Sequence, residues 1–587
     1  MNALASIGLA LAVLVLGVKA APAQSVRRVY LNAKIYTASD EAPTAEAMAT
    51  ENGRIVGIGS KRDVLPFIDE GVEIVDVSGR VILPGLIDAH AHMMGLGQLK
   101  VGVIDLAGTK SYEEVIDRVR ARADAVPRGT WILGRGWDHE LWPSGELPTH
   151  QLLSDAVPDH PVWLSRVDGH AALANAAAMK AAGIDDRTPS PEGGEILRGD
   201  DGRATGIFVD NAQPLIEGAV PPHARGEDAE LILAAQDMCL SAGLTGVHDM
   251  GVSPETVEVY KQLAADGRLK MRMYVLVPGQ VAIEYFAQHG IYVSGRVTVR
   301  ACKLYMDGAL GSRGAWLLEP YADRPVDRDG DPYVGLNVVD PLFVDKVAKD
   351  ANDHGYQVCT HAIGDRANRR VLDAYEFAQA IAIPATSAAG ESAGETTGPG
   401  AGQPLGSGLL HARNNRFRIE HAQLLDAADI PRFEDLGVLP SMQPTHCTTD
   451  MRWIEERIGR DRTVGAYAWR SLIDSGVPIA SGSDFPVESH NPFLGIYAAV
   501  TRQDLEGAPA GGWHPEQRMT RAEALKSFTI WAAYAAFEED EKGTLEVGKL
   551  ADFVVIDRDI MTCEAGLIPD TKVLKTVIGG ETVYEGE

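Results

Sequence analysis

The stretch Val81-Ile82-Leu83-Pro84-Gly85-Leu86-Ile87-Asp88-Ala89-His90-Ala91-His92 decides the fold, because an apolar run leads into two histidines that flank an alanine. At the end of a β-strand, residues two apart point to the same side. His90 and His92 can therefore face one cation, while Ala91 leaves room between them. This spacing suits a divalent metal. Two histidines around an alanine also arise by chance, so the interpretation depends on partners elsewhere in the chain.

Four later segments have the same design, an apolar, strand-like run that leads to one residue able to bind a metal. They are 297–302 before Lys303, 357–360 before His361, 417–420 before His421 and 477–483 before Asp484. In a barrel of parallel strands the carboxyl ends gather on one face, which brings distant residues to a single mouth. Helical stretches such as 227–242 and 366–380 alternate with these runs. This alternation predicts an α/β chain with a (β/α)8 TIM-type barrel.

Further motifs narrow the interpretation. The set comprises 85–92 (GLIDAHAH), Asp168-Gly169-His170 with Asn175, Lys303 with 307–313 (DGALGSR), 360–365 (THAIGD), Glu420-His421 and 481–484 (SGSD). With these residues the chain resembles the amidohydrolase superfamily, and more narrowly its amidohydrolase-3 branch of YtcJ-like metal-dependent hydrolases. The first and last motifs are shared across the superfamily, whereas the Asp-Gly-His and Gly-Ser-Arg motifs point to this branch. The resemblance covers nearly the whole mature chain.

The resemblance implies a set of metal ligands. His90, His92 and Asp484 would bind the more buried ion, and His361 and His421 the outer one. Imidazoles hold borderline metals, so zinc is the expected divalent ion, with one or two ions per chain. Taken singly, each of these histidines could instead be a hydrogen-bonded core residue.

Lys303 and Asp484 would have special roles in such a centre. A lysine amine is a poor ligand while protonated, but after reaction with carbon dioxide it becomes a carbamate, and a carboxylated Lys303 could bridge two ions. A hydroxide between the ions would attack an amide carbonyl. Asp484 is the predicted catalytic residue, because it would take the proton from the attacking water and deliver it to the leaving nitrogen. A mononuclear site and an ion-paired Lys303 remain open.

Other residues after strand-like runs are candidates for the mouth of the barrel. His170 and Arg313 are predicted to bind substrate, by donating hydrogen bonds to its carbonyl or by binding its carboxylate. Structural roles are the alternative, such as a pair between Arg313 and Asp307. His248 and His446 do not fit the ligand series and are interpreted as structural or substrate-lining. Four tryptophans in loop-like stretches suggest an aromatic or apolar substrate group, or are packing anchors: Trp137, Trp142, Trp316 and Trp453.

The two ends of the chain predict a second domain. Short strand-like runs occur in 26–82 and again in 540–587, so both ends are expected to pair into one small β-sandwich beside a barrel domain at 83–535. Residues from about 384 to 407 are rich in Gly, Ala, Ser, Thr and Pro without hydrophobic periodicity. They predict a low-complexity surface insertion, either a tolerated loop or a substrate lid.

The amino-terminal segment, residues 1–23, differs in composition from the rest of the chain. An apolar run followed by Ala21-Pro22-Ala23 predicts a signal peptide at 1–23 and an exported, periplasmic or secreted protein, with no stable membrane insertion after cleavage. A retained anchor or a misassigned start codon is the alternative, because the only lysine nearby follows the apolar run.

Composition sets limits on the partners. The chain of 587 residues is 45% hydrophobic and 23% charged, which suits a large soluble enzyme, and its net charge of −28 with no Lys/Arg stripe argues against a nucleic-acid partner. Five cysteines, an odd number, do not form a disulfide framework.

The expected function is hydrolysis of a non-peptide C–N bond in a small-molecule substrate, of amide, N-acyl or N-formyl type. Deamination or ester hydrolysis on the same metal centre is one alternative. A non-catalytic exported binding or regulatory protein that keeps the fold is another. Homodimerisation is an expectation from the family alone.

Overall fold

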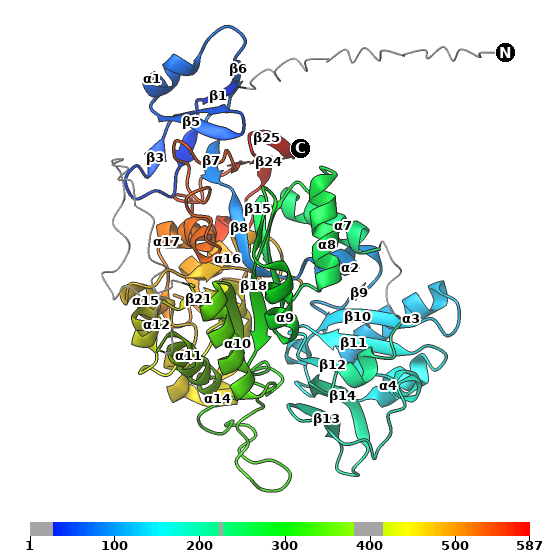
Figure 1. Cartoon of the computed structure of the whole chain (residues 1–587). Coiled ribbons are helices and arrows are strands. Elements are labelled where there is room, and N and C mark those ends of the chain that lie inside the picture. The colour runs from blue at the N-terminus through cyan, green and yellow to red at the C-terminus, as the bar shows by residue number, and fades with distance from the viewer. Residues whose placement is uncertain (1–26, 222–226, 381–414, 587) are drawn as a thin grey trace, which may run out of the picture.

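Eight parallel strands form a nearly closed barrel in the computed structural model, which describes residues 27–221, 227–380 and 415–586 (Figure 1). In sheet order they are β22 (Ala480–Ser481), β21 (Leu439–Met442), β20 (Arg418–His421), β19 (Gln357–Ala362), β18 (Val297–Tyr305), β16 (Arg272–Pro278), β15 (Leu244–Asp249) and β8 (Leu86–Ala91). Two backbone hydrogen bonds join the ends of this sheet, from Asp484 N to His90 O at 2.7 Å and from His92 N to Phe485 O at 2.8 Å. The predicted (β/α)8 TIM-type barrel is confirmed.

The barrel strands are continuous apolar runs because helices cover them. Every residue of β8, β15 and β19 is buried, as expected for parallel strands that are covered on both faces. The helices that alternate with the strands include α7 (Glu227–Ser241), α8 (Pro254–Ala265), α9 (Gly279–His289), α10 (Pro341–His354), α11 (Asp365–Ala380), α12 (Ile430–Leu436) and α15 (Trp469–Asp474). Local signals set their ends. In α10, Asp340 accepts a hydrogen bond from Leu342 N, and Gly355 ends the helix in the left-handed conformation.

A second sheet lies within the segment predicted as barrel. Its strands are, in sheet order, β13 (Gly194–Arg198), β14 (Ala204–Asp210), β12 (Ala171–Ala174), β11 (Val162–Arg166), β10 (Ile132–Trp137) and β9 (Ile104–Asp105). With the helices α3 (Tyr112–Ala125) and α4 (His150–Ala156), this inserted sheet forms its own apolar core and sits beside the barrel (Figure 1). It separates β8 from the next barrel strand, β15, in the chain.

Strands from both ends of the chain pair as predicted. One sheet has the order β25 (Glu581–Glu585), β24 (Val573–Ile578), β23 (Phe553–Ile556), β7 (Val81–Pro84), β2 (Lys34–Tyr36) and β3 (Thr44–Ala45). The other has the order β5 (Arg54–Gly59), β4 (Ala47–Glu51), β1 (Arg27–Leu31) and β6 (Glu73–Asp76). Side chains of the two sheets share one apolar core, in which the rings of Tyr30 and Phe553 lie 5.0 Å apart. β7 continues directly into β8, so the stretch that opens the sequence argument joins the small domain to the barrel.

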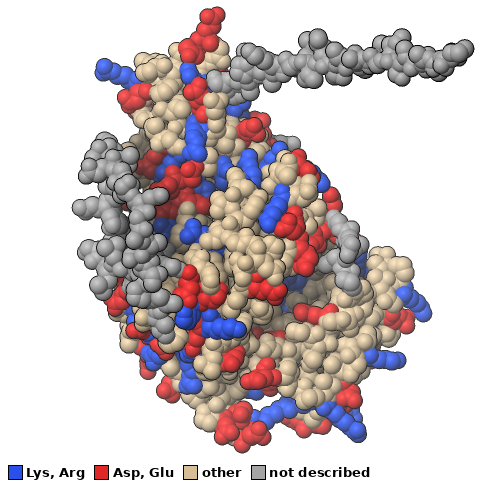
Figure 2. Space-filling model, viewed as in Figure 1, with Lys and Arg blue, Asp and Glu red and all other residues tan. Residues whose placement is uncertain are grey.

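Two predicted segments, the signal peptide at 1–23 and the insertion at about 384–407, lie outside the described residues. Among the residues that are described, no helix is both long and apolar enough to cross a membrane. Figure 2 shows Lys and Arg side chains scattered among acidic ones over one face of the molecule, without a continuous basic stripe on that face.

Candidate metal centre

A cavity of about 580 Å³ opens at the carboxyl ends of the barrel strands and is lined by both the barrel and the inserted sheet. All six predicted metal ligands line it: His90, His92, Lys303, His361, His421 and Asp484. The imidazole rings adjoin one another, with centroids 5.7 Å apart for His90 and His92, 4.8 Å for His90 and His421, and 4.5 Å for His361 and His421. The barrel therefore gathers in one place residues that are far apart in the sequence.

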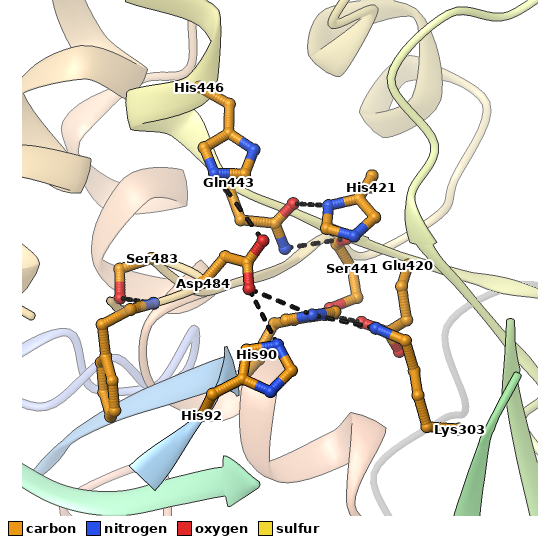
Figure 3. Close-up of polar contacts among 12 residues, drawn as sticks. His90, His92, Lys303, Glu420, His421, Ser441, Gln443, His446, Ser483 and Asp484 are labelled. Atoms are coloured by element: carbon orange, nitrogen blue, oxygen red, sulfur yellow. Dashed lines mark hydrogen bonds and ion pairs between the residues drawn. The ribbon is translucent and has the colours of Figure 1, made fainter. Parts of the chain in front are cut away.

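Asp484 lies at the centre of this group (Figure 3). Its Oδ1 atom is 3.5 Å from His90 Nε2 and 3.2 Å from His92 Nε2, and one ligand atom from each of these three residues lies within 4.8 Å of the others. Asp484 has a φ of +58° and His421 a φ of +74°, conformations that non-glycine residues adopt rarely and that the barrel must hold in place. The buried Oδ1 atom accepts no hydrogen bond from the described residues. A buried carboxylate oxygen facing two imidazoles fits a divalent cation.

Lys303 extends from β18 into the same group. Its Nζ atom lies 3.1 Å from His90 Nε2, and the side chain is buried. Burial lowers the pKa of Lys303 to about 8, although the carboxylates of Glu420 and Asp484 act in the opposite direction. About a tenth of the amine is therefore uncharged at pH 7, far more than for an ordinary lysine, and the uncharged form is the one that can act as a nucleophile.

Buried neighbours orient the imidazoles. His90 Nδ1 lies 2.6 Å from Glu420 Oε2, and the other oxygen of Glu420 pairs with Arg418 Nε at 2.8 Å. Burial alone would raise the pKa of Glu420, but Arg418 and His90 hold it below its ordinary value. The carboxylate therefore accepts a hydrogen bond from His90 Nδ1–H and leaves the Nε2 lone pair facing the cavity. His421 Nδ1 contacts Gln443 Oε1 at 2.7 Å in the same manner.

Contacts with Gly308 and Asp307 orient the imidazole of His361. Its Nε2 atom lies 3.5 Å from both Gly308 O and Asp307 Oδ1, which leaves Nδ1 as the nitrogen available to a ligand. Burial lowers the pKa of His90 to about 4 and that of His361 and His421 well below the ordinary value. All three imidazoles are therefore neutral at neutral pH, as metal ligation requires.

Of the two predicted substrate-binding residues, His170 lines the cavity and Arg313 does not. His170 lines the cavity, its ring centroid 4.8 Å from that of His361, and its Nδ1 contacts Asp210 Oδ1 at 2.7 Å. Arg313 is not among the residues that line the cavity, and its role in binding substrate stays a prediction. Its guanidinium pairs with Asp323 at 2.8 Å, and its backbone has a φ of +62°. The alternative pair with Asp307 does not form either, since that carboxylate accepts backbone hydrogen bonds from Trp316, Ile363 and Gly364.

The sequence interpretation undervalued His446. Its Nε2 atom is 3.9 Å from Asp484 Oδ2, and ligand atoms of His421, His446 and Asp484 form a second group within 4.8 Å. The available signal was its position after the barrel strand β21. His248 is structural, since it is buried beside Arg418 with 3.0 Å between His248 Nδ1 and an Arg418 nitrogen.

One of the tryptophans predicted to contact substrate lines the cavity, and two others pack in the interior. Trp453 lines the cavity. Trp137 and Trp142 are buried packing residues whose indole N–H groups donate to the backbone carbonyls of Leu164 and Thr109.

Several known proteins are similar to this chain over most of its length. The model of the amidohydrolase family matches residues 73–584. Protein LONG AFTER FAR-RED 3 of Arabidopsis thaliana is 34% identical over 567 residues, which cover 94% of this chain and 91% of that protein. YtcJ of Bacillus subtilis, which is named as an amidohydrolase, is 32% identical, with 94% and 98% covered. The N-substituted formamide deformylase of Arthrobacter pascens is 27% identical, also with 94% and 98% covered.

A solved structure shares the whole architecture. An uncharacterized metal-dependent hydrolase from Pyrococcus horikoshii superposes with a TM-score of 0.70 at 26% identity, covering 92% of this chain and 99% of that one.

Proposed function

Because the chain belongs to the amidohydrolase family, we propose that it is a metal-dependent hydrolase that cleaves a non-peptide C–N bond of a small molecule, of the amide, N-acyl or N-formyl type. The observation that carries this proposal is the convergence of four histidines, one buried lysine and one aspartate on a single cavity: His90, His92, His361, His421, Lys303 and Asp484. A relative of nearly the same length, named as a formamide deformylase, supports the choice of bond.

The proposed ion is zinc, held by His90, His92 and Asp484, with His361 and His421 holding a second ion where two are present. When bound, such a metal polarises a carbonyl group and lowers the pKa of water. The neutral amine of Lys303 is proposed to attack the carbon of carbon dioxide and lose a proton, giving a carbamate whose oxygens add to the ligand set. The lowered pKa of Lys303 supports this step, because a protonated amine has no lone pair.

The residues of the chain then move the proton and orient the substrate. One buried oxygen of Asp484 has no hydrogen bond from the described residues and the other lies 3.9 Å from His446 Nε2, which supports the proposal that Asp484 accepts a proton from the attacking water. It would deliver that proton to the leaving nitrogen, which otherwise departs as a poor anionic leaving group. His170, fixed by Asp210, would donate a hydrogen bond to the substrate carbonyl oxygen.

The first test is the metal content of the purified protein, expressed with zinc and bicarbonate, beside a Lys303→Ala variant. Two metals per chain in the wild type, falling in the variant, support the carbamate-bridged hydrolase. One metal that is unaffected by the variant favours a mononuclear centre. Turnover of N-formyl and N-acyl amines separates the hydrolase from a deaminase or ester hydrolase. A protein that binds no metal would overturn the hydrolase in favour of a binding or regulatory role.

We also propose that the chain is exported and loses residues 1–23. Expression with the native start, followed by amino-terminal sequencing of the periplasmic or secreted fraction, tests this. A chain that retains Met1 and stays with the cells would contradict it.

A further inference from the structure

The cavity contains an arginine that the proposed chemistry does not use. Arg135 lies near the end of β10 in the inserted sheet and lines the cavity opposite the barrel. A β-bulge follows it, because Arg135 is paired with Ser165 of β11 whereas Trp137 is paired with Arg166, and Gly136 between them has a φ of +103°. Such a bulge re-aims the neighbouring side chain. Gly169 leaves space beside the guanidinium, whose nearest nitrogens lie 3.5 Å from where a Cβ would be.

Arg135 differs from the other arginine of the cavity wall in its partners. The Arg166 guanidinium donates to Asp138 at 2.7 Å and to Asp168 at 2.6 Å, so its charge is matched twice. For Arg135, the structure gives one long hydrogen bond, 3.4 Å to Val167 O, while its Nε atom is buried without a partner. Within the described part of the chain, no carboxylate lies at salt-bridge distance from it. Most of its five N–H donors are therefore unused.

Three acidic side chains on the same side of the cavity already have hydrogen-bond or ion-pair partners. Asp210 is hydrogen-bonded to His170, as Asp138 and Asp168 are to Arg166. Two further acids of the cavity wall lie on the barrel side and also have partners. Asp450 accepts from Tyr467 at 2.6 Å and Glu488 from Thr449 at 2.7 Å. Burial raises the pKa of both carboxyl groups. Arg135 thus forms no ion pair with the described residues, although Asp484 and Asp168 act on its charge from a distance, and a buried guanidinium in this position is stabilised by an anion that enters the cavity to pair with it.

We propose that Arg135 binds a carboxylate of the substrate, so that the cavity accepts N-acyl or N-formyl compounds bearing an anionic group on the amine side, such as N-acylated amino acids. The inference rests on the proposed function for the scissile bond but on separate residues for the anion. The planar guanidinium suits bidentate binding of a carboxylate. A cavity of about 580 Å³ accommodates a molecule that spans from Arg135 to the barrel ligands.

Binding of small probes tests the site without turnover. Acetate and 3-phenylpropionate, each beside its neutral amide, are titrated by calorimetry into the zinc-loaded wild type and into Arg135→Gln. The wild type should bind each acid more tightly than its amide, and Arg135→Gln should lose about tenfold or more of the affinity for the acids only. The exposed Arg128, whose side chain is 85% exposed and which is not among the residues lining the cavity, gives the matched control Arg128→Gln, which should bind like the wild type.

A second variant guards against misfolding. Arg135→Lys keeps the charge and loses the planar fork, so it should retain part of the preference for acids. Unchanged zinc content and circular dichroism confirm that the centre is intact. Equal binding of acid and amide by the wild type, no binding of either acid, or unchanged binding in Arg135→Gln would overturn the proposal, since a carboxylate held by the metal alone does not depend on Arg135.

Kinetics separates this inference from the proposed function. If N-formylphenylalanine is hydrolysed with a kcat/KM at least tenfold above that of N-formylphenethylamine, and Arg135→Gln removes this difference, both stand. If neither compound is hydrolysed while the probe binding depends on Arg135, the hydrolase proposal fails for these substrates and the anion site stands. If the neutral formamide is the better substrate in the wild type, the anion site is overturned while the hydrolase stands.

Discussion

His90 Nδ1 lies 2.6 Å from Glu420 Oε2 inside the barrel, and this contact fixes which nitrogen of His90 faces the cavity. Both side chains are fully buried, and Arg418 holds the far oxygen of the carboxylate. The order of strands explains the contact, because β8 and β20 approach one another only across the barrel interior. Arg418, Glu420 and His90 thus form a chain of polar contacts that ends at the proposed metal site.

This relationship predicts the effect of Glu420→Gln. Loss of the charge weakens the orientation and basicity of His90, so zinc affinity should fall about 10–100-fold. Competition with a chromophoric chelator measures it, with Glu434→Gln on the exposed surface of α12 as the control. Because Arg418 is left buried without its anion, the variant should also unfold at lower denaturant. Wild-type affinity in a folded variant would contradict the proposed orientation.

Asp484→Asn tests the proton transfer. The amide still fills the space between the histidines but cannot accept a proton, so kcat on a formamide substrate should drop by about 10²–10⁴-fold. Zinc content is measured on the same samples. His446→Ala is the comparison, since His446 contacts Asp484 only at 3.9 Å and should cost less. If Asp484→Asn retains the wild-type kcat, another group carries the proton.

Gly482 should not tolerate a side chain. A Cβ there would lie 2.5 Å from His90 N and 2.6 Å from Asp88 Oδ1, where β22 closes against β8. Gly482→Ala should therefore destabilise the fold by about 1–3 kcal/mol and weaken zinc binding, because the proposed ligands His90, in β8, and Asp484, just after β22, lie at this junction. Gly295, with nothing within 4 Å of its Cβ position, provides the control Gly295→Ala. Chemical denaturation measures both. Equal stability of the two variants would show that the strands can separate without cost.

The contact between the barrel and the small domain predicts an acid limit to stability. Arg272 at the start of β16 donates to Asp552 Oδ1 at 2.8 Å, just before β23. Burial would raise the pKa of Asp552, but Arg272 lowers it below its ordinary value in the folded protein. Its stabilising effect is therefore full above the ordinary aspartate pKa of about 4 and is lost as the pH falls through the lower folded value.

Asp552→Asn should accordingly be less stable than the wild type at neutral pH, by about 3–5 kcal/mol, with a smaller difference in strong acid. Urea denaturation at several pH values measures this, with the exposed Asp461→Asn as the control. If the difference in stability between Asp552→Asn and the wild type does not change with pH, the pair of Arg272 and Asp552 is not the source of the acid limit to stability.

Much of the fold and the centre of the site could be predicted from the sequence. The runs before Lys303, His361, His421 and Asp484 carry their strand signal locally, since parallel strands covered on both faces are apolar throughout. The inserted sheet could not be recognised as separate, because its strands have the same apolar character as barrel strands and differ only in their pairing. The partner of Arg313 could not be predicted either, because its pair with Asp323 depends on tertiary contacts and not on the motif around it.

The sequence by itself determined the barrel, the ends that pair into the small domain, and the residue types available for a metal, because hydrophobic period and side-chain chemistry are local properties. Only the tertiary structure decided which nitrogen of each histidine faces the cavity, that His446 lies beside Asp484, and that Arg135 forms no ion pair with a carboxylate in the part of the chain that is described. Those facts depend on contacts between residues far apart in the chain, and distances across a cavity follow from packing rather than from any pattern along the sequence.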